Sequence, residues 1–241
     1  DNSRVVVMGL CPSAMTTADS HTTYSLPSRA GLTDVLVTPN GVTGSRKQPF
    51  GRALEFAHAA VRIVLKARRT DNTVGKLYVK NLKLTMPARL VCGGLKWDTG
   101  TKQYLAAPAA ADLVINHSGQ ILSTEDTQVA VFYLTPCSPA DLLTDLTGTG
   151  GTPGLTLTAD VAKDINFTTG ARNASFPILD GNLNFMDQFG SPATQLKGGE
   201  SYETTLKFDI DSFTLEGEEK EWEDGGKMTV PVVVPEPTLG P

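Results

Sequence analysis

The sequence predicts an all-β protein, and three observations support that prediction. Threonine is abundant in the 241-residue chain, together with 23 glycine and 15 proline residues, and this composition favours strands joined by many turns. Apolar residues in amphipathic helical registers are scarce. Several short segments instead alternate apolar and polar residues, as half-buried strands do. At this length the chain buries enough surface to fold without a metal or a disulfide.

The first 50 residues are expected to form peripheral strands and loops. Two short apolar runs, at residues 5–10 and 32–38, are separated by stretches rich in threonine, serine and proline. Such stretches are typical of turns. The pattern therefore favours a succession of short strands at the periphery of the protein.

The segment 54–66 gives the first strong signal, and it fits either a helix or a strand. Val61, Ile63 and Leu65 alternate with residues on the opposite face, and the β-branched side chains favour the strand. The apolar residues before His58 have the opposite parity. A strand here must therefore slip by one residue, and we predict a bulge at residues 58–60.

The remaining strands follow from the same alternation and from turn residues. We predict strands at residues 76–85, 128–135, 155–158 and 201–211, and a hairpin joining residues 90–92 to 103–105 through Gly93-Gly94 and residues 97–100. In the clearest of them, Tyr202, Leu206 and Phe208 share one face, which indicates an antiparallel sheet with one face in water. The small, unpatterned segment 106–111 suggests a boundary between domains 1–108 and 109–241.

The charge of the chain argues against two classes of partner. With 21 Lys and Arg against 26 Asp and Glu, the net charge is −5, and the basic cluster at residues 62–69 is short. Nucleic acids and anionic membrane surfaces both need clustered cations. No apolar run approaches the roughly 18 residues that span a bilayer. Because the chain begins with polar residues, we expect that any targeting signal has already been removed.

No motif points to catalysis, a metal or a cofactor. The candidate groups are three histidines and three cysteines far apart in the sequence: His21, His58, His117, Cys11, Cys92 and Cys137. Their spacing fits neither a zinc site nor a disulfide framework, and His58 within a strand is more typical of a packed or solvent-tipped residue than of a base. The Gly-rich loop 148–154 lacks the lysine of a phosphate-binding loop. The acidic run 216–224 lacks the calcium-loop pattern. We therefore predict no enzyme activity.

Two segments resemble a known family. Residues 54–65, with the sequence LEFAHAAVRIVL, resemble a strand of the pattern F-x-H-A-hydrophobic-x-(K/R). Residues 196–202, LKGGESY, lead through Leu206 and Phe208 to WEDGG at 222–226, which is similar to a closing G-G-x-x-Y … W-x-x-G-G hairpin. Both patterns belong to the fimbrillin-like proteins, the pilin subunits and adhesins of the type V fimbriae of Bacteroidales. The resemblance brackets residues 54–226.

The resemblance implies two tandem transthyretin-like β-sandwich domains and export as a lipoprotein precursor to the outer membrane. It implies a structural fimbrial subunit or a cell-surface adhesin, with a membrane contact only through the lipid anchor of the precursor. The partners would be other fimbrial subunits and a host or bacterial surface ligand. A protease would remove an N-terminal strand after an arginine and so open a groove in the subunit. A strand of another subunit would fill this groove, because an unpaired edge is a template for a donated strand.

The residues that would carry this mechanism are found at both ends of the chain. Arg29 and Arg46 are candidate processing sites, since both lie in polar, turn-rich stretches open to a protease. The candidate donor or edge strand contains Thr229, Val230, Val232, Val233 and Val234. Pro231 cannot donate a ladder hydrogen bond and Pro235 ends the strand. The segment could therefore also be an edge strand of this chain itself.

The alternative function is a surface glycan- or protein-binding module that does not polymerise. Trp97, Tyr104 or Trp222 would then form a stacking platform, although aromatic residues make up only 7% of the chain. An exposed coplanar pair of rings would favour this alternative. A removable N-terminal strand that covers an apolar groove would favour assembly.

Overall fold

A computed structural model describes most of the chain. The described residues are 5–18, 21–26, 28–39, 42–45, 54–69, 78–121, 124–137, 156–162, 164–168, 171–177, 196–208, 213–221 and 227–232. Within these ranges the regular elements are all strands, so the all-β prediction is confirmed. No helix in the described part is long and apolar enough to cross a membrane.

The strands form four sheets and a ribbon. The ribbon pairs β1 (Val5–Val7) with β6 (Val42–Gly44). The three-stranded sheet has the order β2 (Leu10–Cys11), β5 (Leu36–Val37), β7 (Ala57–His58). One four-stranded sheet has the order β11 (Gln103–Pro108), β10 (Cys92–Asp98), β4 (Thr23–Ser25), β3 (Thr16–Ala18).

Two larger sheets complete the fold. The second four-stranded sheet has the order β12 (Leu113–His117), β9 (Tyr78–Met86), β14 (Thr156–Ala162), β15 (Arg172–Pro177). The five-stranded sheet has the order β13 (Thr127–Leu134), β8 (Val61–Arg69), β16 (Glu200–Phe208), β17 (Phe213–Glu221), β18 (Lys227–Val232).

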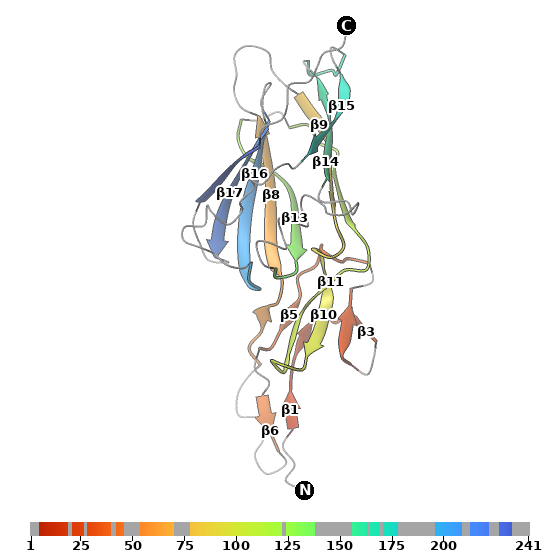
Figure 1. Cartoon of the computed structure of the whole chain (residues 1–241), viewed down its shortest axis with the longest axis vertical. Helices are drawn as coiled ribbons and strands as arrows, with labels where there is room; N and C mark the ends of the chain where they lie inside the picture. The colour runs from red at the N-terminus through yellow and green to blue at the C-terminus, as the bar shows by residue number, and fades with distance from the viewer. Residues whose placement is uncertain are drawn as a thin grey trace.

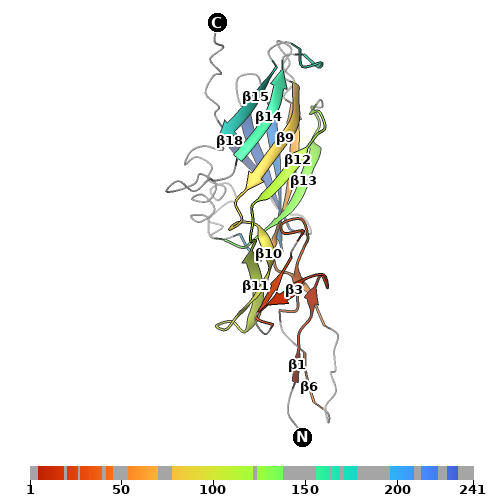
Figure 2. The same cartoon turned by 90° about the vertical axis from the view of Figure 1, so that its right-hand side faces the viewer.

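The molecule is elongated, with the β1–β6 ribbon at one end and the two larger sheets toward the other (Figures 1 and 2). Its buried apolar residues form two clusters. The larger cluster lies between the two larger sheets and includes Ile63 of β8 and Leu84 of β9. The smaller cluster includes Val37 of β5 and Leu95 of β10. The larger cluster uses strands from both sides of residue 108, and the division into domains 1–108 and 109–241 stays a prediction.

The predicted strand at residues 54–66 is confirmed from residue 57 onward, but the predicted bulge is wrong. The chain leaves β7 at His58 and enters β8 at Val61, and these strands lie in different sheets. Ala60 belongs to the smaller core and Val61 to the larger one, and both are fully buried. The change of parity therefore marks a change of sheet.

The strand predicted at residues 201–211 is confirmed as β16 through residue 208, and residues 209–211 lie outside the described residues. Strand β16 pairs with different polarity on its two sides. It runs antiparallel to β17 and parallel to β8. Tyr202, Leu206 and Phe208 are buried as expected, but Ser201 and Thr205 of the other face are buried as well. The expectation of one wet face in a wholly antiparallel sheet is therefore wrong, because β16 lies inside a mixed sheet.

Charged and polar side chains add to the pairing of β16 with β8. The ammonium of Lys66 lies 2.5 Å from a carboxylate oxygen of Glu203, and Arg62 donates a hydrogen bond to the hydroxyl of Ser201 at 3.1 Å. These groups belong to the face of β16 opposite the buried Tyr202, Leu206 and Phe208.

Asn81 produces a bulge in β9. Its φ is +52°, and the register with β14 gains one residue there, from Thr158 opposite Lys83 to Asp160 opposite Lys80. The Asn81 amide donates to the Asp160 carboxylate at 2.7 Å. The bulge lets both Val79 and Leu82 reach the core, although they have opposite parity.

We expect Asn81→Val to destabilise the protein by about 2 kcal/mol, because a β-branched residue is strained at a positive φ. Asn81→Gly should cost less than about 1 kcal/mol, since glycine accepts this φ and an exposed hydrogen bond contributes little. Urea unfolding of both variants measures the difference. Equal losses would show that the hydrogen bond, and not the backbone conformation, is what Asn81 supplies.

Candidate functional site

The first feature of the candidate site is the strand that covers β10. The backbone N–H of Leu26 donates to the oxygen of Gly93, and that of Trp97 donates to the oxygen of Thr22, both at 2.7 Å. Between these bonds β4 pairs antiparallel with β10. Residues 22–26 thus form a continuous cover over this edge of β10.

Gly94 permits the close approach of the two strands. Its φ is +149°, and a Cβ built on it would lie 2.0 Å from the backbone oxygen of Tyr24. The Gly93-Gly94 pair was predicted to shape a hairpin turn. It lies instead inside β10, at an irregularity of the β10–β11 register, while the turn itself spans residues 99–102.

The cover strand is followed at once by an exposed turn that contains Arg29. The N–H of Leu32 donates to the oxygen of Arg29 at 3.0 Å. Gly31, with φ +71°, anchors the turn: its N–H donates to Cys92 and its oxygen accepts from Tyr133. Arg29 therefore lies on the surface between anchored neighbours. Arg46, the other candidate processing site, lies outside the described residues.

A close side-chain contact links the segment after Arg29 to β7. Nδ1 of His58 lies 2.5 Å from a carboxylate oxygen of Asp34, while the other oxygen of Asp34 is buried without a hydrogen-bond partner. Burial raises the pKa of Asp34, although the neighbouring His58 acts to lower it. His58 is thus packed and paired, as the sequence indicated, rather than placed as a free base.

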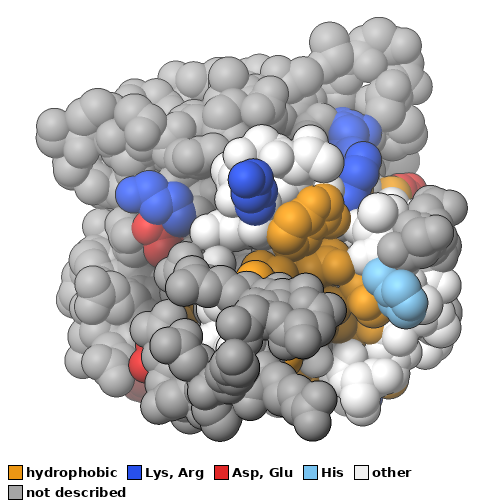
Figure 3. All heavy atoms as spheres, turned by 90° about the horizontal axis from the view of Figure 1, so that it is seen from below, with side chains coloured by type: hydrophobic (Ala, Val, Ile, Leu, Met, Phe, Trp, Pro, Cys, Tyr) orange, Lys and Arg blue, Asp and Glu red, His pale blue; other side chains and the backbone are white. Residues whose placement is uncertain are grey.

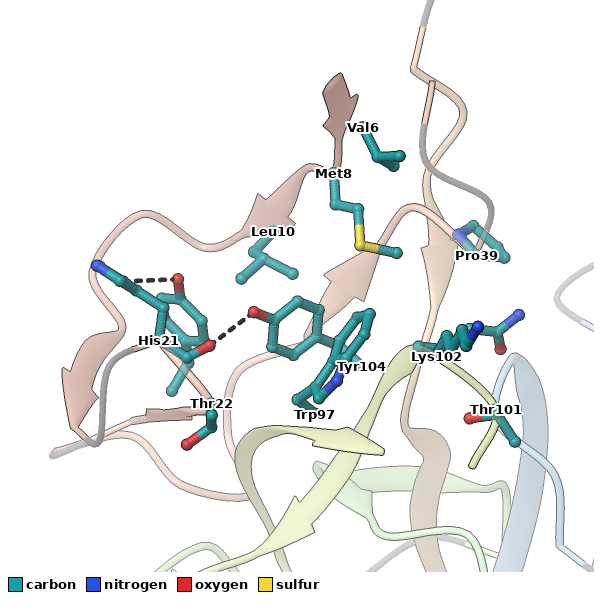
Figure 4. Close-up of a pocket in the computed structure, with 12 residues that line it drawn as sticks. Val6, Met8, Leu10, His21, Thr22, Pro39, Trp97, Thr101, Lys102 and Tyr104 are labelled. Atoms are coloured by element: carbon teal, nitrogen blue, oxygen red, sulfur yellow. Dashed lines mark hydrogen bonds between the residues drawn. The ribbon is translucent and has the colours of Figure 1, made fainter. Parts of the chain in front are cut away.

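The second feature is a cavity of about 830 Å³, which is lined by Val6 of β1 and by residues of the β10–β11 hairpin. Figure 1 shows β1 at one end of the molecule. Figure 4 shows Met8 and Leu10 on one side pointing toward Trp97 and Tyr104 on the other. Its lining residues come from the N-terminal strands and the β10–β11 hairpin: Val6, Met8, Leu10, His21, Thr22, Tyr24, Pro39, Trp97, Thr101, Lys102, Gln103 and Tyr104. The view from this end shows hydrophobic side chains gathered together, with basic side chains and a histidine around them (Figure 3).

The aromatic rings of the cavity pack edge to face. The Trp97 and Tyr104 rings are inclined by 65° with centroids 5.0 Å apart, and those of Tyr24 and Tyr104 by 74°. Burial raises the pKa of Tyr104, and the nearby Tyr24 adds a smaller upward shift. Trp97 and Tyr104 therefore do not form the coplanar pair that would favour a stacking platform. Trp222 lies outside the described residues.

The three cysteines are free. No disulfide joins Cys11, Cys92 and Cys137. Burial raises the pKa of the Cys92 thiol to about 11, so it stays protonated at neutral pH. Among the described residues, no group of three or more His, Cys, Asp or Glu could hold a metal ion.

The candidate donor strand lies at an edge of the five-stranded sheet. Thr229, Val230 and Val232 belong to β18, which pairs with β17. Pro231 stands opposite Thr214 in that pairing. Val233 and Val234 lie outside the described residues.

Sequence reasoning found Trp97 and Tyr104 but missed the residues that face them. Val6, Met8 and Leu10 alternate within the apolar run 5–10, and this alternation was the available signal for one wall. His21 has no such signal, because its place depends on pairing between β4 and β10, which are distant in the sequence.

No family model and no curated protein matches the sequence. Among solved structures, the chain is similar to candidate cell adhesion proteins of Bacteroides uniformis (11% identity, 92% of this chain and 74% of that chain, TM-score 0.49) and Parabacteroides distasonis (12% identity, 98% and 72%, TM-score 0.46). A third, from Bacteroides ovatus, is 12% identical over 97% and 70% of the two chains with a TM-score of 0.43. At these values the function has to be inferred from the chain's own contacts.

We expect Gly94→Ala to destabilise the protein by about 2–3 kcal/mol, because the added Cβ forces β4 away from β10. Gly100→Ala is the matched control: its Cβ would meet the Asp98 side chain at 3.6 Å, an ordinary contact, and should change stability by less than about 0.5 kcal/mol. Urea unfolding measures both. A neutral Gly94→Ala would show that β4 is not held closely against β10.

The pKa of Asp34 predicts a pH-dependent contribution to stability. Because the pKa is raised in the folded state from its ordinary value of 3.8, the folded protein binds this proton more tightly than the unfolded chain. The favourable contribution is complete below pH 3.8 and is lost as the pH rises through the raised value. The stability of the wild type relative to Asp34→Asn should therefore fall over this range.

For Asp98→Asn we expect a pH dependence of stability with the opposite sign. Hydrogen bonds from the Thr101 side chain, the Thr101 N–H and the Gly100 N–H lower the pKa of Asp98. Its contribution is present above pH 3.8 and is lost as the pH falls through the lowered value. Unfolding measured across the acid range should give slopes of opposite sign for the two variants, and slopes of the same sign would contradict the burial of Asp34.

Proposed function

We propose that the chain is a structural subunit or adhesin of a cell-surface assembly and that it joins its neighbours by strand exchange. The observation that carries this proposal is the cover strand: β4 lies over the edge of β10 and is followed directly by the exposed turn of Arg29. One cut there separates the cover strand from the rest of the chain.

Removal of residues 1–29 would leave polar backbone groups of β10 open. The bonds from Leu26 to Gly93 and from Trp97 to Thr22 would be lost, together with the ladder between them. An unpaired edge of this kind is a template for another strand. It therefore provides the main-chain half of an acceptor groove.

The same cut would also uncover apolar surface. Leu26 is a buried member of the smaller core, and Leu10, Met15 and Tyr24 pack against it. Their removal would expose Cys92 and Leu95, which are now fully buried. A strand whose alternate side chains are apolar would cover this surface again, which is the usual basis of specificity in strand addition.

The proposed donor is the segment that contains Thr229, Val230 and Val232. Because β18 lies at the edge of its sheet and pairs with β17, its departure would break fewer backbone bonds than the loss of an interior strand. Pro231 limits the number of ladder bonds it could form elsewhere. If β18 stays in place, the subunit accepts a strand without donating one, as a tip or anchor component would.

The remaining features of the proposal follow from the resemblance to fimbrillin-like proteins. They are export as a lipoprotein precursor, a place at the cell surface or in a fimbrium, and two tandem transthyretin-like domains. The partners would be other fimbrial subunits and a host or bacterial surface ligand. The proposed activity is assembly and adhesion, without catalysis or a cofactor.

Limited digestion with an arginine-specific protease tests the proposal. We expect one early cut, after Arg29, followed by conversion of the monomer to polymers in size-exclusion chromatography. Mass spectrometry identifies the cut. Arg29→Lys is the matched control, since it keeps the charge and the exposed turn but resists the protease, and it should stay monomeric.

The outcomes separate the parts of the proposal. Polymers formed after a cut at Arg46 alone would support assembly after cleavage but would show that the processing site is Arg46 and not Arg29. A cleanly cut chain that stays folded and monomeric would overturn self-assembly by strand exchange. Assembly of uncut Arg29→Lys to the same extent would show that removal of the cover strand is not the trigger.

A further inference from the structure

The cavity near β1 has one aliphatic wall. Val6, Met8 and Leu10 line it, and their spacing of two residues places them on the same face of an extended chain. Pro39 adds a further apolar group. Nothing on this wall can hydrogen-bond strongly to a ligand through a side chain.

The opposite wall is aromatic, and its hydroxyl groups are already engaged. The Tyr104 hydroxyl donates to the backbone oxygen of His21 at 2.7 Å, and the Tyr24 hydroxyl lies 3.1 Å from Nδ1 of His21. The two rings are thereby fixed, and they offer carbon atoms to the cavity. A body held between these walls is therefore apolar rather than rich in hydroxyl groups.

The polar end of the cavity is positive. Lys102 lines it at the end of the β10–β11 turn, and no carboxylate is among the described lining residues. The Asp98 carboxylate of the same turn is engaged by the Gly100 and Thr101 N–H groups and by the Thr101 hydroxyl. Figure 4 shows Lys102 on the side of the rings that is nearer to Pro39. The ammonium of Lys102 and the indole N–H of Trp97 have no hydrogen-bond partner in the described part of the chain.

We propose that this cavity binds an amphipathic carboxylate, with the acyl chain or apolar ring body between the walls and the carboxylate at Lys102. The volume of about 830 Å³ lies within the range of about 300–1,000 Å³ of small-molecule sites. A single ammonium at one end of an apolar space suits a ligand with one anionic end. This activity goes beyond assembly and does not depend on it.

Decanoate is the probe, and uncut protein is titrated with it below its micelle concentration. We expect saturable binding by calorimetry. Lys102→Gln should weaken it about fivefold to tenfold, the effect of losing one partly exposed ion pair and hydrogen bond. Decanol, which has no charge, should bind the wild type and Lys102→Gln equally.

Two matched variants control for indirect effects. Lys96→Gln removes an exposed charge from β10 at a position that is not in the lining, and Leu105→Ala removes an exposed apolar group from β11. Both should bind decanoate like the wild type. Trp97→Ala should lose binding, and Trp97→Phe, which keeps an aromatic ring in the wall, should retain most of it.

Absence of saturable decanoate binding to the folded wild type would overturn the proposal. If Lys96→Gln weakened decanoate binding as much as Lys102→Gln, the weakening would be a general charge effect and the assigned site would be overturned. Binding of glucuronate in place of decanoate would replace the ligand class with an acidic sugar. Because the uncut chain is used, these outcomes are independent of polymerisation after cleavage.

Discussion

The polypeptide passes from one hydrophobic core to the other between two adjacent residues, Ala60 and Val61, and the rest of the structure is arranged around that crossing. Both residues are fully buried, so neither sheet can shift along the chain without exposing one of them. Downstream, β8 lies between β13 and β16. Upstream, β7 holds β5 through the pairing of Leu36 with His58, and the Asp34–His58 contact lies beside it.

The sequence predicted the strands whose signal is local. The alternation at residues 61–65 and 202–208 and the turn residues of the β10–β11 hairpin were sufficient, because a half-buried strand and a tight turn impose their own patterns. The parity change near His58 predicts a bulge, but in the structure it marks the passage from β7 to β8. A bulge and a passage between sheets produce the same local pattern, and only the pairing partners distinguish them.

The candidate site was predictable only in part, because it is assembled from segments distant in the sequence. Trp97 and Tyr104 are neighbours across a hairpin and could be paired in advance. His21 joins them through hydrogen bonds to Tyr104 and Tyr24, and the aliphatic wall comes from Val6, Met8 and Leu10. Gly94 shows the same limit. Its sequence context predicts a turn, whereas in the structure a glycine is needed there because β4 approaches β10 closely.

The parallel pairing of β16 with β8 also sets the order in which the protein can fold. Lys66 and Glu203 are 137 positions apart in the chain, so a very long loop closes when their strands meet. Until β16 is present, the larger core lacks Tyr202, Leu206 and Phe208, and one side of β8 has no partner. Contacts of such sequence separation slow folding. A growing chain therefore cannot complete its larger core until β16 has been synthesised.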